Sequence, residues 1–254
     1  SSYSFKKSDM ESNFEKIPSQ KGRIAIVTGA NNGIGLETTV GLAKVGYKVI
    51  MACRNVEKAV SARNKIRQNI PQADLDILQL DLSNLNSVSE FVQQFSQKYQ
   101  KLDVLVNNAG VMTTSGQKNT AGIELQFATN HLGHFVLTSS LIDYMPNDKN
   151  SRIISLSSVA HRRAKIHFGD IECKNDEGFG AAYGQSKLAC LMFGDELNRR
   201  LNESGSKICS ITVHPGVSET GLFNESSWIQ GLLFKTLGLI MTHSNEQAAA
   251  PALY

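Results

Sequence analysis

The sequence has few cysteines, prolines and tryptophans, and it carries little excess charge. Its 254 residues include 4 cysteines, 5 prolines and 1 tryptophan, and the net charge is +3. The cysteines form no Cys-x-x-Cys pair, so we expect buried thiols and a reducing, intracellular compartment. Without a dense stripe of Lys and Arg, the weak positive charge argues against nucleic acid as a partner.

Long hydrophobic runs are missing as well. No stretch reaches the ~18 consecutive apolar residues of a membrane-spanning helix, and the first residues, SSYSFKKSDMESNFEK, contain no hydrophobic signal segment. We interpret 1–20 as an N-terminal extension and expect a cytoplasmic location or one on the cytosolic side of a membrane. With no Pro- or Gly-rich linker and no internal repeat, we expect a single domain over 21–254.

Short apolar runs alternate with longer amphipathic segments along the chain. The apolar runs are continuous rather than alternating, which is typical of parallel strands covered on both faces. The sequence therefore predicts an α/β fold, a single doubly wound (Rossmann) domain with a mostly parallel sheet. We expect strands at 23–30, 47–54, 75–82, 102–110, 151–158 and 207–216, and helices at 35–45, 56–69, 87–99, 123–145 and 182–201.

The first predicted strand runs directly into the glycine-rich segment TGANNGIG, residues 28–35. Its glycines allow a tight turn, close approach of the backbone to a ligand and close packing of the next helix. A helix that begins there presents free N–H groups to a pyrophosphate. A glycine turn without a ligand is the alternative. We expect a phosphate site formed by Gly29, Asn31, Asn32, Gly33, Ile34 and Gly35.

The second predicted strand ends in MACRN, where folds that bind NAD often place an Asp or Glu. This sequence has Cys53 and Arg54 there. No carboxylate repels a 2′-phosphate, and the guanidinium attracts one through a charge-assisted fork. We therefore expect NADP(H) in preference to NAD(H). The alternative is that Arg54 merely lies in solvent at the end of the strand.

The spacing TGxxxGIG resembles the short-chain dehydrogenase/reductase family, and the resemblance continues along most of the chain. It implies further cofactor contacts with the adenine, with the adenine ribose through the NNAG turn, and with the nicotinamide carboxamide through HPGV and a later threonine. Asp81 has an alternative interpretation as the N-cap of the next helix. The residues implied are Asp81, Leu82, Asn108, Ala109, Gly110, Pro215, Gly216, Val217 and Thr220.

Tyr183 and Lys187 lie four residues apart in AYGQSKLA and so share one face of a predicted helix. A free tyrosine loses its proton near pH 10, and a neighbouring ammonium favours the phenolate. Such pairs occur by chance in many helices, but the cofactor motif favours the catalytic interpretation here. The family's YxxxK signature implies that Tyr183 transfers the proton, while Lys187 tunes it and binds the nicotinamide ribose.

The resemblance implies two further catalytic residues, Ser158 and Asn130. Ser158 would polarise the substrate carbonyl, with Ser157 as the fallback. Asn130 would kink its helix and support a water that links Lys187 to solvent. An asparagine hydrogen-bonded only to its neighbours in the helix is the alternative.

The segment NHLGHF and the insertion between Ser158 and Tyr183 resemble the retinol-dehydrogenase-like branch of the family. His131 and His134 have a spacing that metal ligands use, but no third ligand partners them, so we interpret them as packing residues and expect no metal. The insertion keeps the branch pattern at Ala160, His161, Ile166, Phe168, Asp170 and Ile171.

An apolar helical stripe after Thr220 predicts a substrate lid around 218–245 and hence a small apolar substrate. The same stripe is compatible with contact to a membrane surface. The sequence predicts an NADP(H)-dependent oxidoreductase that acts on the carbonyl or alcohol carbon of a retinoid-like or lipid substrate. The alternatives are a steroid or xenobiotic carbonyl reductase and a non-catalytic cofactor-binding scaffold or sensor. Self-association into a homo-oligomer is compatible with each.

Overall fold

Six parallel strands form one central sheet in the computed structural model, which describes residues 17–113, 116–171 and 180–214. The order across the sheet is β3-β2-β1-β4-β5-β6, and each neighbouring pair is parallel. This confirms the predicted doubly wound α/β domain. The strands are β1 Ile24–Thr28, β2 Lys48–Cys53, β3 Leu75–Gln79, β4 Val104–Asn107, β5 Arg152–Leu156 and β6 Cys209–Val213.

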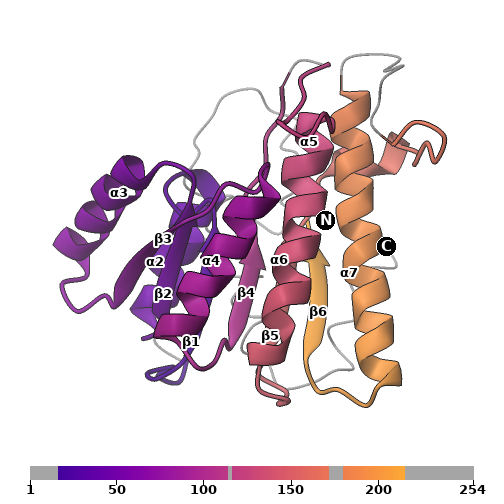
Figure 1. Cartoon of the computed structure of the whole chain (residues 1–254). Helices are drawn as coiled ribbons and strands as arrows, with labels where there is room; N and C mark the ends of the chain where they lie inside the picture. The colour runs from indigo at the N-terminus through magenta and orange to yellow at the C-terminus, as the bar shows by residue number, and fades with distance from the viewer. Residues whose placement is uncertain (1–16, 114–115, 172–179, 215–254) are drawn as a thin grey trace, which may run out of the picture.

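Helices cover both faces of this sheet (Figure 1). Helices α2 (Gly33–Lys44) and α3 (Val56–Asn69) pack on one face against side chains of β1 and β2 such as Val27 and Met51. Helices α4 (Leu85–Lys98), α6 (Gly133–Leu141) and α7 (Ala181–Glu203) lie on the other face. Because successive side chains of a strand point to opposite faces, the continuous apolar runs supply both cores.

The strand order reverses between β1 and β4, which are neighbours in the sheet. The connections that leave these two strands therefore run to opposite faces, and the carboxyl ends of the strands at such a reversal are where doubly wound folds bind ligands. Parallel strands bring all their carboxyl ends to one edge of the sheet. The segments after Thr28, Cys53, Asn107, Leu156 and Val213 accordingly meet there.

The predicted long helix 123–145 is divided into four parts. A short helix α5 (Leu125–Phe127) leads into a π-helical turn η1 (Ala128–Leu132), which is followed by α6 and a 3-10 turn η2 (Ile142–Tyr144). A π-helical turn inserts an extra residue and rotates the following helix. At the junction between η1 and α6, Gly133 packs against the loop that follows β3. A Cβ on Gly133 would lie 2.2 Å from Leu82 O.

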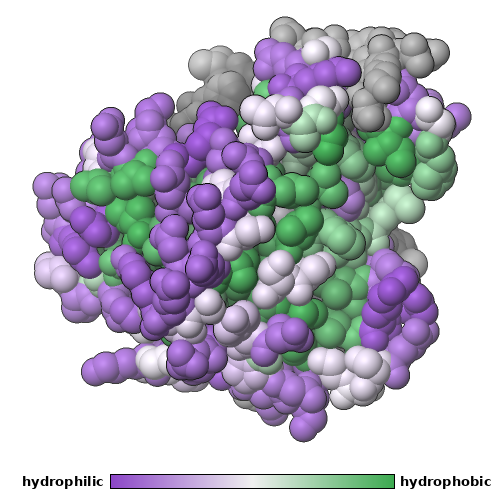
Figure 2. All heavy atoms as spheres, in the orientation of Figure 1, coloured by the Kyte–Doolittle hydropathy of each residue, from purple (hydrophilic) through white to green (hydrophobic). Residues whose placement is uncertain are grey.

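The surface seen in Figure 2 differs between the two halves of the molecule. Polar side chains predominate over α4 and surround a smaller apolar patch at α3, whereas apolar side chains gather over α6 and the adjoining part of α7. Phe135 and Met192, from these two helices, are 44% and 49% exposed. No helix among the described residues is both long enough and apolar enough to cross a bilayer.

Candidate active site

The TGANNGIG segment forms the turn between β1 and α2. Gly29 has φ +66° and Gly33 has φ +52°, left-handed conformations that glycine adopts without strain. A Cβ on Gly35 would lie 2.3 Å from Gly29 O, whereas nothing lies within 4 Å of a Cβ placed on Gly33. Asn32, the N-cap, makes no side-chain hydrogen bond to the first turn of α2. The turn is thus closed on its inner side and open on its outer side, which fits a pyrophosphate at the helix N-terminus.

Thr28, the last residue of β1, ties the glycine turn to the turn after β4. Its Oγ1 accepts hydrogen bonds from the backbone N–H groups of Asn108 and Ala109, both at 2.9 Å. Its carbonyl accepts a third from Asn108 Nδ2 at 2.7 Å. Gly110 follows Ala109 in this turn, and a Cβ on Gly110 would lie 3.3 Å from Lys187 Nζ. The predicted ribose-binding turn therefore lies directly beside the predicted catalytic lysine.

The end of β2 presents a cation where NAD-binding folds present a carboxylate. Cys53 is buried, and this burial raises the pKa of its thiol to about 11, so the thiol is neutral at physiological pH. Arg54 follows at the exposed surface. Asn55 then caps α3, its side chain accepting a hydrogen bond from Lys58 N at 2.8 Å. Arg54 thus lies between a strand end and a helix start.

Asp81 organises the turn between β3 and α4. Its Oδ1 accepts hydrogen bonds from Ser83 N at 2.9 Å and from Ser83 Oγ at 2.7 Å. The N-cap of α4 is Asn84, so the alternative interpretation of Asp81 as the N-cap is wrong. Leu82, beside it, is buried. Contact of Asp81 and Leu82 with an adenine stays a prediction.

Asn130 is 1% exposed and lies in the π-helical turn. Its Oδ1 accepts a hydrogen bond from Val111 N at 2.7 Å, and its Nδ2 donates to Val111 O at 3.0 Å and to Ser186 Oγ at 2.9 Å. These partners come from the loop after β4 and from α7. The alternative, an asparagine bonded only within its own helix, is therefore wrong.

Tyr183 and Lys187 lie on the first turns of α7, with Lys187 Nζ 5.9 Å from the centre of the tyrosine ring. Nζ donates a hydrogen bond to Leu156 O at 3.0 Å, and the lysine is 5% exposed. Burial lowers the pKa of Lys187 from its ordinary value of 10.5, because the ammonium loses water. Among the residues that the structure describes, no carboxylate pairs with this ammonium. Hydroxyl groups of a ligand would supply the missing polar contacts.

The two serines after β5 have different surroundings. Ser157 is buried, and its Oγ donates a hydrogen bond to the backbone carbonyl of Lys187 at 2.7 Å. Ser158 is partly exposed and is the N-cap of the 3-10 turn η3 (Val159–Arg163), where its Oγ accepts from Ala160 N at 3.3 Å. As an acceptor there, Ser158 keeps its hydroxyl proton available for a ligand. These contacts favour Ser158 over Ser157 as the substrate-binding serine.

Gln185, a buried side chain of α7, makes two hydrogen bonds to the insertion after Ser158. Gln185 Oε1 accepts a hydrogen bond from His167 N at 2.9 Å, and its Nε2 donates to Ile171 O at 3.2 Å. Phe168, between these two contacts, is 79% exposed. Of the branch-pattern residues, Ala160 and His161 lie in η3, and Ile166, Phe168, Asp170 and Ile171 lie in the following loop.

Several predicted features lie outside the described residues. The proposed carboxamide site, the substrate lid at 218–245 and most of the N-terminal extension fall in this category. The described part of the chain ends at His214, one residue beyond β6. The site residues concerned are Pro215, Gly216, Val217 and Thr220.

The two histidines of the NHLGHF segment have different surroundings, because the partners of one of them are distant in the chain. His131 packs among aromatic rings, as predicted, with ring centroids 5.2 Å from Phe127 and 6.1 Å from Phe193. His134, however, is hydrogen-bonded at both ring nitrogens, which a packing interpretation does not predict. The sequence signal was present, because a histidine at a helix position that faces the core needs polar partners.

Residues 23–229 match the short chain dehydrogenase family. The chain belongs to this family, and it is an NAD(P)-dependent short-chain dehydrogenase/reductase.

Within the family the chain is similar to retinol dehydrogenases. It is 41% identical to retinol dehydrogenase 13 of Homo sapiens over 239 residues, which are 92% of this chain and 71% of that protein. It is 42% identical to retinol dehydrogenase 12 of Mus musculus over 196 residues, 77% and 61% of the two chains. Polyprenol dehydrogenase of Homo sapiens is 35% identical over 242 residues, 94% and 73% of the two chains.

Solved structures share the fold. A protein from Mycobacterium paratuberculosis superposes with a TM-score of 0.75 at 34% identity, over 91% of this chain and 80% of that chain. A metagenomic short-chain oxidoreductase, solved in complex with NADP, superposes with a TM-score of 0.70 at 23% identity, over 88% and 92%.

Proposed function

We propose that this dehydrogenase/reductase uses NADP(H) and interconverts an apolar alcohol with its aldehyde or ketone, with Tyr183 as the general acid and base. The observation that carries the proposal is the buried ammonium of Lys187, which lies beside Tyr183 and against Gly110 at the carboxyl edge of the sheet. A buried cation without a carboxylate partner is costly in a fold. Its position next to a phenol and beside the predicted ribose-binding turn is the arrangement that proton transfer with a bound cofactor requires.

The cofactor would lie across this edge. Its pyrophosphate fits the open side of the turn at Gly33, and a 2′-phosphate would meet the guanidinium of Arg54. The ribose next to the nicotinamide would contact Lys187 Nζ, and Asp81 and the Asn108 turn would line the adenosine part. We assign the carboxamide contacts to Pro215, Gly216, Val217 and Thr220 by resemblance alone.

When bound, the nicotinamide would supply the hydride chemistry for reduction of the substrate carbonyl carbon. In the reducing direction the Tyr183 hydroxyl gives its proton to the carbonyl oxygen, and in the oxidising direction the Tyr183 phenolate takes the proton of the substrate alcohol. The Ser158 hydroxyl donates a hydrogen bond to the oxygen as negative charge develops on it. The Lys187 ammonium stabilises the charge left on the phenol. Asn130 holds Ser186 and the loop at Val111 and so fixes the first turns of α7.

The apolar substrate is supported by the relatives as well as by the predicted lid. Retinol dehydrogenases and polyprenol dehydrogenase are named for long apolar alcohols. Contact with a membrane surface, self-association and a location in a reducing intracellular compartment remain predictions. Cys53, Cys190 and Cys209, all free thiols, are compatible with that compartment.

A turnover assay with NADPH and a panel of apolar aldehydes, steroid ketones and xenobiotic carbonyls tests the proposal. We expect the aldehydes to be reduced fastest and Tyr183→Phe to lower kcat by about 10²–10⁴-fold with NADPH affinity nearly unchanged. Tyr144→Phe is the matched control, because it removes the same atom at η2, away from the carboxyl edge. Full activity of Tyr183→Phe would refute the catalytic assignment. NADPH binding without turnover of any substrate would favour the scaffold or sensor.

A further inference from the structure

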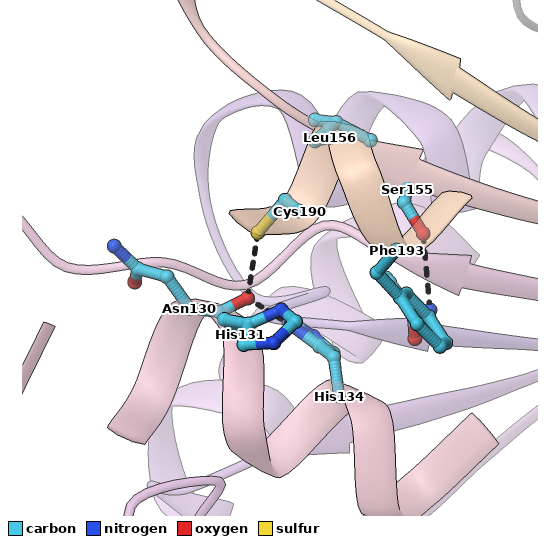
Figure 3. Close-up of a pocket in the computed structure, with 8 residues that line it drawn as sticks. Asn130, His131, His134, Ser155, Leu156, Cys190 and Phe193 are labelled. Atoms are coloured by element: carbon cyan, nitrogen blue, oxygen red, sulfur yellow. Dashed lines mark hydrogen bonds between the residues drawn. The ribbon is translucent and has the colours of Figure 1, made fainter. Parts of the chain in front are cut away.

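One buried histidine lies between the cofactor turn and the π-helical turn of the catalytic region. His134, on α6, is 4% exposed and borders a small cavity between α6, α7 and the ends of β4 and β5 (Figure 3). Its Nε2 lies 2.9 Å from Thr28 Oγ1, and its Nδ1 lies 2.9 Å from the backbone carbonyl oxygen of Asn130. These partners lie on β1 and in η1, so the ring joins two parts of the site.

The partners determine which ring nitrogen carries the proton. A carbonyl oxygen can only accept, so Nδ1 must donate to Asn130 O. Burial lowers the pKa of His134 to about 4, because the imidazolium would lose its water and lies near Lys187 and His131. The ring is therefore neutral at physiological pH, and Nε2 is an acceptor. The geometry assigns the Nδ1–H tautomer.

The acceptor at Nε2 orients the hydroxyl of Thr28. That oxygen already accepts the N–H groups of Asn108 and Ala109, so its own proton is left to donate. The two candidate acceptors are His134 Nε2 at 2.9 Å and Val106 O at 3.3 Å. The shorter contact directs the hydroxyl proton to the ring. The ring thus fixes the oxygen that holds the turn lining the cofactor site.

The donor at Nδ1 acts on the other part of the site. The Asn130 carbonyl also accepts a hydrogen bond from the Cys190 thiol at 3.1 Å, so α6 and α7 both hold this one backbone oxygen (Figure 3). Burial raises the pKa of Cys190 to about 11, so its thiol keeps the proton that it donates. The side chain of the same asparagine contacts Ser186, which is adjacent to Lys187. The imidazole therefore helps to set the register of the π-helical turn against α7.

We propose that His134 is a positioning residue that couples the cofactor turn at Thr28 to the π-helical turn at Asn130. This inference rests on the proposed function, since it assumes that the first turn lines a bound NADP(H) and the second supports Lys187. The ring would act through its contacts with Thr28 and Asn130. Its two nitrogens hold two backbone segments that belong to different steps, cofactor binding and proton transfer.

The two contacts can be removed one at a time. An asparagine amide reaches the position of Nδ1 and a glutamine amide the position of Nε2, so His134→Asn keeps the Asn130 contact and His134→Gln keeps the Thr28 contact. His134→Leu removes both. His131→Phe is the matched control, because that residue lies one turn away on the same face and packs among rings. Each variant is measured for NADPH dissociation constant by fluorescence, for kcat at saturating NADPH and for thermal midpoint.

We expect His134→Asn to raise the NADPH dissociation constant about 5-fold while kcat stays within about 2-fold. His134→Gln should lower kcat about 5-fold while the NADPH dissociation constant stays within about 2-fold. Both expectations follow because one hydrogen bond contributes about 1 kcal/mol. His134→Leu should show both losses and His131→Phe neither. Parallel changes in both parameters that follow the thermal midpoint, or no change at all, would overturn the proposal and leave a merely structural histidine.

A measurement on the wild type keeps the proposal testable even if the variants fail to fold. Ring ¹⁵N chemical shifts of His134 should report a neutral Nδ1–H tautomer from pH 8 to about pH 5, with or without NADPH. A protonated ring at pH 7 or an Nε2–H tautomer would exclude it. The ring ¹⁵N shifts and the NADPH affinities do not depend on turnover. An active Tyr183→Phe enzyme would therefore refute the proposed function but would leave the assignment of the His134 tautomer unchanged.

Discussion

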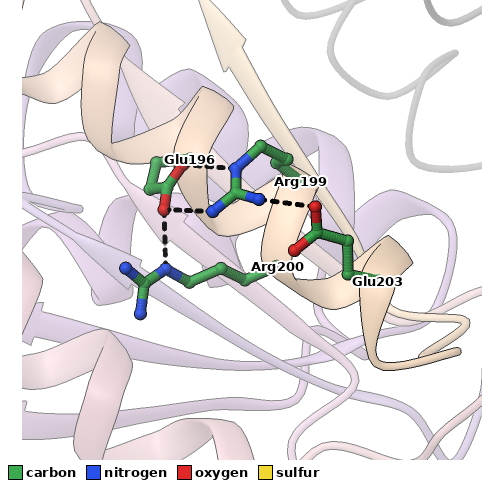
Figure 4. Close-up of polar contacts among 4 residues, drawn as sticks. All are labelled: Glu196, Arg199, Arg200 and Glu203. Atoms are coloured by element: carbon green, nitrogen blue, oxygen red, sulfur yellow. Dashed lines mark hydrogen bonds and ion pairs between the residues drawn. The ribbon is translucent and has the colours of Figure 1, made fainter.

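Helix α7 carries a lysine near its start and two arginines near its end, and these cations have different surroundings. Lys187 is buried, and its Nζ donates to a backbone carbonyl of β5. Arg199 and Arg200 lie on the surface, where both pair with Glu196 at 2.7 Å, and Arg199 also pairs with Glu203 at 2.5 Å (Figure 4). One end of the helix thus neutralises its own charge, and the other does not.

The difference indicates where the fold leaves room for a ligand. In the exposed cluster every charged side chain is paired with one of opposite charge. Ion pairs at such exposure add little to stability. A buried ammonium that lacks a counter-charge lowers stability by an amount that depends on how far it is desolvated. Arg54, at the same edge of the sheet as Lys187, is a second cation without a carboxylate partner among the described residues. We infer that the cofactor supplies polar contacts to both, ribose hydroxyl groups to Lys187 and a 2′-phosphate to Arg54.

The substitution with the largest expected effect is Lys187→Met. It removes the charge but keeps a side chain of similar length, so kcat should fall by about 10²–10⁴-fold. Its midpoint of urea unfolding should be equal to or higher than that of the wild type, because the buried ammonium is gone. Turnover and unfolding are measured on the same preparation. A variant that loses activity together with stability would show that Lys187 is a structural residue.

The same pair of proteins gives a pH dependence with a defined sign. Burial holds the folded-state pKa of Lys187 below its unfolded value near 10.5. Between these two pKa values the unfolded wild type binds more protons than the folded one, so wild-type stability rises with pH over that interval. The Met variant lacks this contribution. Its advantage in stability should be largest below the folded-state pKa and shrink as the pH approaches 10.5, and a constant difference would contradict the assignment.

An intermediate effect is expected from Arg54→Gln. Loss of one charge-assisted pair with the 2′-phosphate should weaken NADPH binding about 10-fold, whereas NADH binding should not change. Lys58→Gln, on the exposed side of α3, is the control for loss of one positive charge nearby. Fluorescence titrations with both cofactors measure the ratio. Tighter binding of NADH than of NADPH by the wild type would show that the choice of Arg54 as the discriminating residue is wrong.

The sequence predicted the strands and helices well because their periodicities are strong and each apolar run is bounded by a turn. The helix predicted at 56–69 has these bounds in the structure, and the sheet is parallel throughout the described residues. The strand predicted at 102–110 is shorter, Val104–Asn107, because the predicted range also included the residues of the NNAG turn that follows the apolar run. Apolar character alone does not mark where a ladder of hydrogen bonds ends.

Features that depend on contacts between distant residues were predictable only through the family resemblance, which implied a kink at Asn130 and a preference for Ser158 over Ser157. The π-helical turn at Asn130 shifts the helix by one residue, which leaves its apolar periodicity almost unchanged. Only the close contact of Gly133 with Leu82 and the hydrogen bonds to Val111 make it visible. The choice between Ser157 and Ser158 likewise depended on which hydroxyl faces the backbone of α7. Neither contact leaves a local signal in the sequence.

The smallest expected effect is that of Glu196→Gln at the other end of α7. Hydrogen bonds from Arg199, and then from Arg200, lower the pKa of Glu196 to about 2. A lowered pKa means that the carboxylate stabilises the folded state above its ordinary pKa of 4.5, and that this contribution is lost as the pH falls through about 2. Because the cluster is fully exposed, the loss of stability in the variant should be small at neutral pH and should vanish in about 1 M salt.

Glu90→Gln, which replaces an exposed carboxylate on α4, is the control. A large, salt-independent loss, or reduced turnover, would mean that the two ends of α7 are coupled and that the paired cluster serves the site after all.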